Sequence, residues 1–188
     1  MMDKKQRLLE AALKLFVAFG FHDTPTSKIA KEAGIASGTL FYFFPTKDEL
    51  VKALYLDIKS RMSNYILDTI NEVESLKPIM KGYYTAKHEW ALMHKTEFRF
   101  IEQFNSSPYL NQIAQVEIQR HIQPVKDLLE KGISDKVIKP MDVDIIYMLV
   151  SGHTFSINQY LNAKQFSKSE ENTVIDETFD LLWDMIKV

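Results

Sequence analysis

The sequence predicts an all-α protein in which a small N-terminal head of three helices is followed by a larger helical body. Two observations support this fold class. Apolar residues recur at helical spacing along most of the chain, and no long segment alternates apolar and polar residues as a strand would. The six Gly and six Pro among 188 residues fall mostly at the edges of these apolar segments. The breaks leave room for about nine helices.

The head is expected to occupy residues 1–50. Its first helix carries an apolar stripe and ends at Gly20, because glycine readily adopts the left-handed conformation that closes a helix. A short second helix opens at Thr26 or Ser27 and closes at Gly34. A short third helix covers residues 37–44 and stops before a proline.

The body is expected to occupy residues 51–188 and to begin with a long linking helix. Thr46 and Glu49 have the spacing of a capping box, in which each side chain satisfies a free backbone N–H of the other residue. Ser167 and Glu170 repeat this spacing before the last helix. Both pairs therefore predict helix starts.

Other local signals divide the rest of the body. Ser107 followed by Pro108 has the form of an N-cap with proline at the first helical position. Asp142 is expected to open a long helix that reaches about residue 161. Pro124 lies inside a helical segment and is expected to kink or break it.

Composition excludes several kinds of chemistry. The chain has no cysteine, which rules out disulfides, thiolate zinc sites and cysteine nucleophiles. Its histidines form no i, i+4 pair, and neither a glycine-rich phosphate loop nor a nucleophile-elbow motif occurs. We therefore expect no metal, no cofactor and no enzymatic activity. Neither a signal peptide nor a membrane-spanning segment is recognisable, which predicts a cytoplasmic protein without membrane contact.

Residues 24–47 contain two short helices around a tight turn at Gly34, which is the spacing of a helix-turn-helix. Such a motif holds its second helix outward on a rigid base, and a helix of this size fits the major groove of DNA. Leu40 and Phe44 are four residues apart and are expected to face the core. A three-helix bundle without any role in DNA binding remains open from spacing alone.

The net charge of −2 does not by itself indicate a nucleic-acid partner. The charges are unevenly distributed, with a balance of +2 over residues 1–52 and −4 over residues 53–188. Salt limits the reach of each charge to about 10 Å, so a weakly basic head can bind phosphates locally. Charge alone leaves DNA binding open.

Three segments, AALKLFVAFGF, TSKIAKEAGI and SGTLFYFFPTKDEL, resemble the N-terminal domain of the tetracycline-repressor (TetR) family of transcription regulators. The resemblance is close over residues 5–55 and concerns only the layout of helices beyond them. It implies a homodimer whose third helix reads double-stranded DNA and whose body binds a small molecule. The expected function is a repressor that binds a palindromic operator and is released by a small apolar or aromatic effector.

The resemblance also implies a set of DNA-binding residues. By motif position these are Thr26, Ser27, Lys28, Ser37, Gly38, Thr39, Phe41, Tyr42, Phe43 and Lys47. Residues 26–28 start the second helix, and residues 37–39 are expected to face base edges. Tyr42 is expected to reach the DNA backbone, and Lys47 to hold a phosphate beside the free N–H groups of the next helix.

Three positions depart from the family pattern. The family commonly has an aromatic hydroxyl in place of Phe41 and often a histidine in place of Phe43, so polar contacts with DNA are expected to be fewer. Each ring either meets a thymine methyl or simply packs. Ala36 stands where a serine N-cap is usual, which leaves Ser37 as the expected substitute cap.

The body supplies two further sets of candidates. Because this part of the family usually encloses an effector cavity, the expected effector-binding residues are Trp90, Phe98, Phe104, His121 and Phe155. One stripe of the last helix is expected to form the dimer interface, and its members are Ile175, Phe179, Leu182, Trp183 and Ile186. For both sets a plain role in the core of the monomer is the alternative.

Two other functions stay open at this point. One is a helical small-molecule-binding or scaffold protein that has lost specific DNA binding, which Phe41 and Phe43 would permit. The other is an all-helical enzyme without a recognisable motif. Retardation of a duplex, or turnover of a bound ligand, would discriminate between them.

Overall fold

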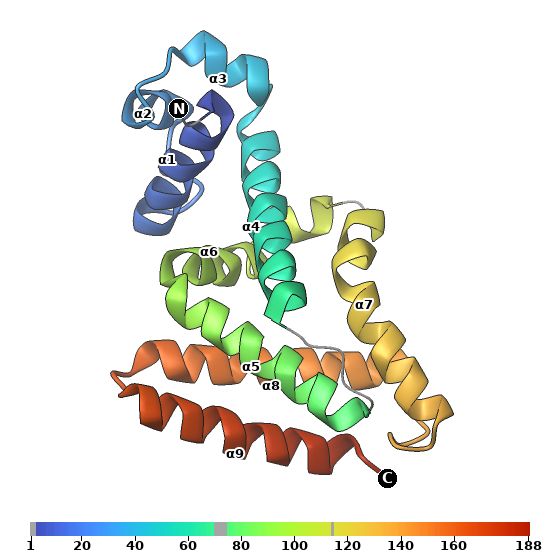
Figure 1. The fold of residues 1–188 in the computed structure, drawn as a ribbon. Coiled ribbons are helices and arrows are strands. Elements are labelled where there is room, and N and C mark those ends of the chain that lie inside the picture. The colour runs from blue at the N-terminus through green and yellow to red at the C-terminus, as the bar shows by residue number, and fades with distance from the viewer. Residues whose placement is uncertain (1–2, 70–74, 114) are drawn as a thin grey trace. The chain divides into compact units, whose positions relative to one another are not determined.

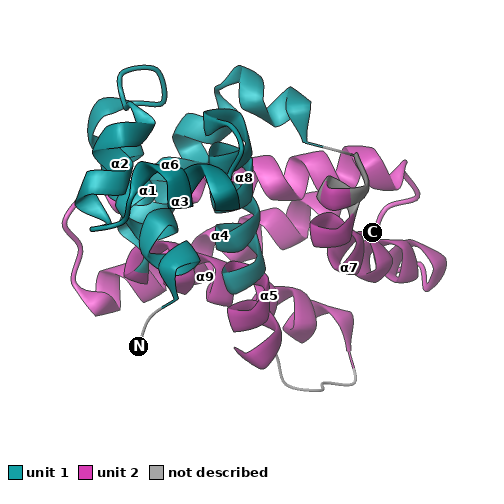
Figure 2. Cartoon of the chain, turned by 90° about the horizontal axis from the view of Figure 1, so that it is seen from above, with its two compact units in different colours: residues 1–61, 94–115 teal, residues 62–93, 116–188 magenta. Residues whose placement is uncertain are grey.

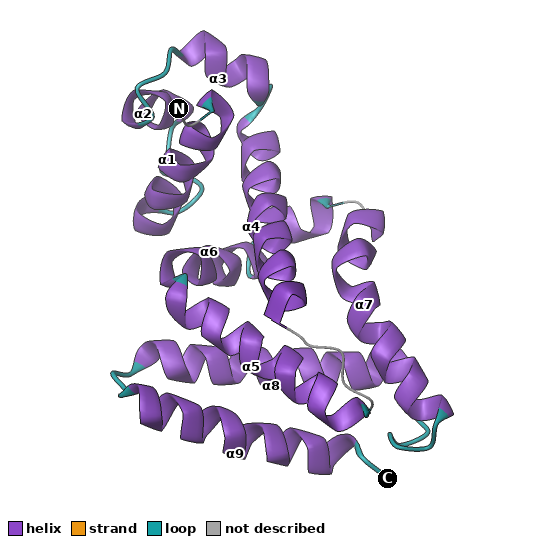
Figure 3. Ribbon diagram, in the orientation of Figure 1, coloured by secondary structure: helices purple, strands orange, loops and turns teal. Residues whose placement is uncertain are grey.

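The computed structural model describes residues 3–69, 75–113 and 115–188, and these ranges fold almost entirely into helices (Figures 1 and 3). The all-α prediction is confirmed, with nine α-helices and one short 3-10 helix in the described ranges. In chain order they are α1 Lys4–Phe19, α2 Thr26–Glu32, α3 Ser37–Phe43, α4 Lys47–Thr69, α5 Leu76–Met93, α6 Lys95–Asn105, η1 Pro108–Gln112, α7 Gln115–Ser134, α8 Val143–Ala163 and α9 Lys168–Ile186.

The helices form two compact units (Figure 2). Unit 1 comprises residues 1–61 and 94–115, and therefore contains α1 to α3, most of α4, α6 and η1. Unit 2 comprises residues 62–93 and 116–188, with α5, α8, α9 and nearly all of α7. The boundary expected at residues 50 and 51 stays a prediction, because backbone compactness does not show which segments fold or act independently.

Unit 1 has its core where α1 packs against α6. The rings of Phe16 on α1 and Phe100 on α6 are both fully buried, with centroids 6.4 Å apart. Gln103 of α6 adds a hydrogen bond from Nε2 to the carbonyl of Val17, at 3.3 Å. A segment that follows α5 in sequence thus packs against the first helix of the head.

Unit 2 has a core built by α5, α7, α8 and α9, and this core includes the stripe that the sequence predicts to be the dimer interface. The apolar stripe of α9 faces inward and packs against Met80, Leu129 and Ile146. Its members are at most 7% exposed: Ile175, Phe179, Leu182, Trp183 and Ile186. Little of their surface is left for a partner chain, so burial in the core of their own chain argues against the predicted assignment to the dimer interface, which no partner chain tests. An amphipathic stripe is apolar whether it packs on its own chain or on a second copy.

Several helix ends lie where the sequence predicts them. Gly20 closes α1 with a φ of 77°, in the region that favours glycine. Ser167 and Glu170 form the complete capping box before α9. Asp142 caps α8, since its carboxylate accepts a hydrogen bond from the N–H of Asp144 at 2.7 Å. These ends depend on local side chain to backbone bonds, which is why local sequence predicts them.

Two predicted features differ from the structure. Thr46 accepts a hydrogen bond from the N–H of Glu49 at 3.1 Å, but the Glu49 carboxylate pairs with Lys52 at 2.6 Å. Only half of that capping box is therefore present. Helix α7 continues through Pro124 without a break. The buried side chains of Val125 and Leu129 hold the following turns in the core of unit 2, which offsets the hydrogen bond that proline removes.

Candidate functional site

The turn between α2 and α3 is fixed by backbone geometry and by one side chain. Gly34 has a φ of 63°, and the next N–H, of Ile35, donates to the carbonyl of Ala30 at 2.9 Å. Arg7 of α1 donates from Nη2 to the carbonyl of Ala33 at 2.5 Å. A Cβ at position 34 would lie 2.9 Å from that nitrogen. The turn therefore rests against α1, and no local sequence signal points to this role of Arg7.

Helix α3 has a buried and an exposed face. Leu40 and Phe44 are 0% and 3% exposed, as the spacing predicts. Tyr42 is 81% exposed and Phe41 is 48% exposed. A Cβ at Gly38 would meet no atom within 4 Å, so this glycine also faces open space. The outer face of α3 is thus free of contacts that the fold requires.

The start of α3 differs from the expectation for Ser37. The N-cap residue is Ala36, which makes no side-chain bond, and its carbonyl accepts from the N–H of Thr39 at 2.9 Å. Ser37 is the first helical residue, so its expected role as substitute cap was wrong. Its exposed hydroxyl makes no hydrogen bond to any residue that the structure describes. The hydroxyl is therefore available to an external partner.

The two lysines predicted to meet phosphates each make one exposed intramolecular contact. Lys28 places its ammonium 3.5 Å from the ring centroid of Phe19, a side chain that is itself half exposed. Lys47 donates to the carbonyl of His22 at 3.0 Å. Neither ammonium has a carboxylate within ion-pair distance in the described part of the chain. Beside Lys28, residues 26 and 27 start α2, the first half-buried and the second exposed.

The two phenylalanines that depart from the family pattern lie in different surroundings. Phe43 is half-buried, and its ring centroid lies 5.3 Å from that of Tyr42 and 6.4 Å from that of Phe44. Phe41 keeps about half of its surface exposed. Intramolecular packing therefore covers part of the Phe43 ring, whereas the Phe41 ring is accessible to an external group.

The candidate effector-binding residues fall in both units. Trp90, His121 and Phe155 lie in unit 2, where Trp90 is 1% exposed and the other two are half-buried. Phe98 and Phe104 lie on α6 in unit 1 and are both buried. The ring of Phe104 stacks on Tyr55 with centroids 4.0 Å apart. Their role toward an effector stays a prediction.

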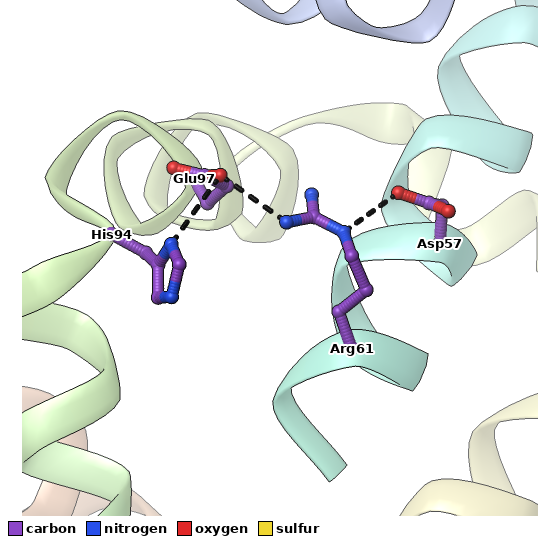
Figure 4. Close-up of polar contacts among 4 residues, drawn as sticks. All are labelled: Asp57, Arg61, His94 and Glu97. Atoms are coloured by element: carbon purple, nitrogen blue, oxygen red, sulfur yellow. Dashed lines mark hydrogen bonds and ion pairs between the residues drawn. The ribbon is translucent and has the colours of Figure 1, made fainter. Parts of the chain in front are cut away.

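A charged cluster joins α6 to α4 within unit 1 (Figure 4). Arg61 of α4 donates from Nε to Asp57 at 3.0 Å and from Nη1 to Glu97 of α6 at 3.3 Å. The Nδ1 atom of His94 lies 3.7 Å from the same Glu97 carboxylate. The cluster borders a cleft of about 300 Å³ between α1, α4 and α6. The cluster therefore joins α6 to α4, and α6 packs separately against α1.

Unit 2 contains a buried polar cluster that the sequence analysis did not anticipate. Tyr84 of α5 donates its hydroxyl hydrogen to Thr178 of α9 at 3.0 Å, and the same oxygen lies 3.3 Å from Nδ1 of His153. Burial raises the pKa of Tyr84 to about 12. One turn further along α5, His88 is completely buried beside Asn158. No local signal distinguishes these polar residues from surface ones.

In the described ranges, no helix is both long and apolar enough to cross a bilayer. These ranges also bring together no group of three or more His, Cys, Asp or Glu side chains able to hold a metal ion.

A rigid helix-turn-helix with an open outer face, followed by a separate helical unit, defines a DNA-binding transcription regulator. The family model for bacterial regulatory proteins of the tetR family matches residues 8–54, and the model for the tetracyclin repressor-like C-terminal domain matches residues 55–188. The chain therefore belongs to the TetR family of bacterial regulatory proteins.

Comparison with individual proteins agrees with this assignment. The transcriptional repressor KstR2 of Mycobacterium tuberculosis is 28% identical over 160 residues, which cover 81% of this chain and 78% of the relative. The fatty acid metabolism regulator protein of Bacillus subtilis is 25% identical over 162 residues, covering 79% and 78%. A TetR-family regulator from Shewanella sp. PV-4 superposes over both full chains with a TM-score of 0.92 and 26% identity. These relatives are regulators rather than enzymes, and nothing in them favours a protein that has lost DNA binding.

Proposed function

We propose that the protein is a homodimeric repressor that binds a palindromic operator through α3 and leaves it when a small apolar or aromatic effector binds the helical body. The part of this proposal that concerns DNA binding rests on the open outer face of α3. The Ser37 hydroxyl has no intramolecular partner among the described residues, and Gly38 has no neighbour that a Cβ would meet. Such a helix start can approach the floor of a major groove and offer Ser37 and Thr39 to base edges.

The positive groups beside α3 complete the interface. On binding DNA, Lys28 and Lys47 each give up one intramolecular contact and bind a phosphate instead. These phosphate contacts strengthen DNA binding but do not distinguish one base sequence from another. Tyr42 supplies a phenol at the exposed edge of the same helix. Phe41 supplies an apolar surface that suits a thymine methyl, in place of a polar contact.

The second copy binds on a different face from the one predicted. Five large apolar side chains of α8 and α9 are between 38% and 70% exposed: Ile145, Met148, Leu149, Leu181 and Met185. We call them the exposed apolar face. The two helices contact each other and run in opposite directions, so the start of α8 lies beside the end of α9 (Figure 1). Gly152 adds open space that lets a partner helix approach closely.

A two-fold dimer presents two identical α3 helices, so its operator must be an inverted repeat. Docking on one side of the duplex places the half-sites about 34–36 Å apart, or a multiple of that distance. The effector releases the repressor from DNA by changing the distance between the two α3 helices. The coupling free energy between an effector site and a DNA-binding site is typically 1–3 kcal/mol, which changes DNA affinity about 5–150-fold.

The buried aromatic residues of the body and of α6 support an apolar or aromatic effector. The fatty acid metabolism regulator among the relatives favours the apolar class. Within unit 1, α6 carries Phe98 and Phe104 and is held to α4 by Arg61 and to α1 by packing. We infer that a displacement of α6 by the effector moves the helices that position α3.

Selection of bound duplexes from a random pool tests this function with the full-length protein. The expected result is one enriched inverted repeat, bound with nanomolar affinity by the wild type. A pool that converges on a single unrepeated site, or on no sequence, would contradict the proposal. Adding decanol or naphthalene to the complex with the selected duplex should then lower its affinity.

A further inference from the structure

Arg7 of α1 contacts the main chain of the turn between α2 and α3. Its Nη2 donates to the carbonyl of Ala33 at 2.5 Å and lies 3.5 Å from the carbonyl of Gly34, which are 26 and 27 residues away in sequence. The backbone hydrogen bonds that close α2 end on other carbonyls, those of residues 29–31. Arg7 therefore gives the end of α2 a partner that the turn itself does not provide.

The surroundings of Arg7 indicate that its guanidinium serves the turn rather than an ion pair. Arg7 lines a groove of about 210 Å³ between α1 and α2, together with Glu10 and Glu32. Neither of these two carboxylates lies within ion-pair distance of the guanidinium. The carbonyls at the end of α2 carry the negative end of the helix dipole, and they attract a positively charged donor.

The helix that carries Arg7 is fixed in place. Leu8 and Leu9, the next two residues of α1, are 0% and 4% exposed. Helix α1 contacts both α2 and α3. A side chain that starts from a buried helix and ends on the turn restricts the positions that the turn can take.

The orientation of α3 depends on what holds its two ends. Of its seven residues, all within the described ranges, only Leu40 is buried. A helix with a single buried side chain can tilt about that point. Phe44 is buried at the far end, and at the near end two residues separate Gly34 from Ser37, the first residue of α3. The Arg7 contact therefore lies beside the end of α3 that is expected to meet bases.

We propose that Arg7 is a positioning residue for operator recognition, which fixes the tilt of α3 through the turn and so raises the preference for the operator over other sequences. This inference rests on the proposed function, in which α3 reads the operator. Hydrogen bonds to base edges need close geometry, whereas attraction between lysines and phosphates tolerates small displacements. Loss of the Arg7 side chain should therefore reduce discrimination between sequences more than general affinity for DNA.

Fluorescence anisotropy of the full-length protein tests the proposal on two duplexes, the operator obtained by selection and a shuffled sequence of the same composition. Discrimination is the ratio of the two affinities at one salt concentration. In Arg7→Met this ratio should fall by about tenfold or more, because the loss of a good base contact costs about 5–150-fold. Affinity for the shuffled duplex should fall by less than about threefold, since one positive charge is lost.

Lys14→Met is the matched control, because Lys14 lies seven residues further along α1, is exposed and lines the same groove. It removes the same charge without touching the turn, so its discrimination should stay within about twofold of the wild type. Arg7→Lys should restore discrimination, since both carbonyls face a single nitrogen that an ammonium can replace. Circular dichroism selects an assay temperature at which every variant is as helical as the wild type.

Four outcomes overturn the inference. An equal loss of affinity for both duplexes in Arg7→Met makes Arg7 a sequence-independent DNA contact. Unchanged discrimination in Arg7→Met means that α3 keeps its orientation without this contact, and no recovery in Arg7→Lys separates the loss from the two carbonyls. An Arg7→Met variant that is unfolded at every temperature makes Arg7 a determinant of stability alone.

Failure of the proposed function gives a different result. If selection with the wild type returns no preferred sequence, the proposed function fails and this inference fails with it. If the wild type prefers an operator and Arg7→Met keeps the same preference, the inference fails alone.

Discussion

Gly38 lies on the outer face of α3, where a Cβ would meet no atom within 4 Å. The fold therefore does not require glycine there, and Gly38→Ala should raise the free energy of unfolding by up to about 1 kcal/mol, because alanine favours helix. Gly38→Leu should fold equally well and lose specific operator binding, because its side chain holds α3 away from the groove. Thermal unfolding and fluorescence anisotropy measure the two effects.

Gly34 provides the matched control for this prediction. Its φ of 63° and the Arg7 nitrogen 2.9 Å from the position of a Cβ make Gly34→Ala destabilising, by roughly 1–3 kcal/mol. If Gly38→Leu kept wild-type affinity for the selected operator, α3 would not approach the bases at this position.

Lys47 is expected to bind a phosphate rather than a base. Lys47→Ala should weaken binding to all duplexes nearly uniformly and lower the slope of log affinity against log salt by about one. Its loss should barely affect stability, since the ammonium bonds one exposed carbonyl. Affinities for two unrelated duplexes across a salt series provide the measurement. A change in which duplex is preferred would instead make Lys47 a reader of bases.

Because of His88, the stability of unit 2 should depend on pH. Its pKa falls from 6.5 to about 4 on folding, so the unfolded chain binds more protons between these values. The stabilisation is fully present above pH 6.5 and is lost as the pH falls through 4, by about 3 kcal/mol in total. Chemical unfolding at a series of pH values should show this loss. A variant that combines His88→Phe with Asn158→Leu should lose correspondingly less stability over the same range, and an identical profile would contradict the assignment.

At the scale of the element, α8 and α9 each have two apolar faces with different partners. The inner faces close the core of unit 2, and the exposed apolar face lies open. Met148 and Leu181 are its most exposed members, at 70% and 67%. Met148→Glu with Leu181→Glu should therefore give a folded monomer, which sedimentation velocity would detect. Leu67→Glu on α4, at a side chain 61% exposed, is the control and should remain a dimer.

A dimer that persists in this double variant would move the interface away from α8 and α9. Substituting Phe179 and Trp183 tests the stability of unit 2 rather than dimerisation, because both side chains are buried in the core and their loss should unfold the unit.

At the scale of the whole molecule, the charged cluster that joins α6 to α4 offers a test of how an effector lowers DNA affinity. Arg61→Met removes the ion pairs to Asp57 and Glu97 but keeps an apolar side chain of similar length. The variant should bind the operator with nearly wild-type affinity and show a smaller loss of affinity when an effector binds. Anisotropy with and without decanol measures this difference. An undiminished response would exclude the cluster from the coupling.

Much of the fold can be predicted from the sequence because its signals are local. Helix periodicity, Gly20, the Ser167 cap and the glycine turn at residue 34 act within a few residues, so the all-α class, the helix-turn-helix and the inward direction of Leu40 follow directly. The start of α3 differs from the local prediction. Capping by Ser37 was a reasonable expectation that the backbone contradicts by starting the helix one residue earlier.

Local signals in the sequence thus establish a helical protein with a helix-turn-helix head, and its motifs are specific enough to indicate the family. The three-dimensional packing was needed to show which apolar stripe of α9 is core, that α6 packs on α1, and that His88 meets Asn158 across 70 residues of sequence. The physical reason is that apolar periodicity reports that a face will be buried without naming the partner. A polar side chain carries no periodic signal at all, so a buried polar contact becomes visible only when the helices are placed side by side.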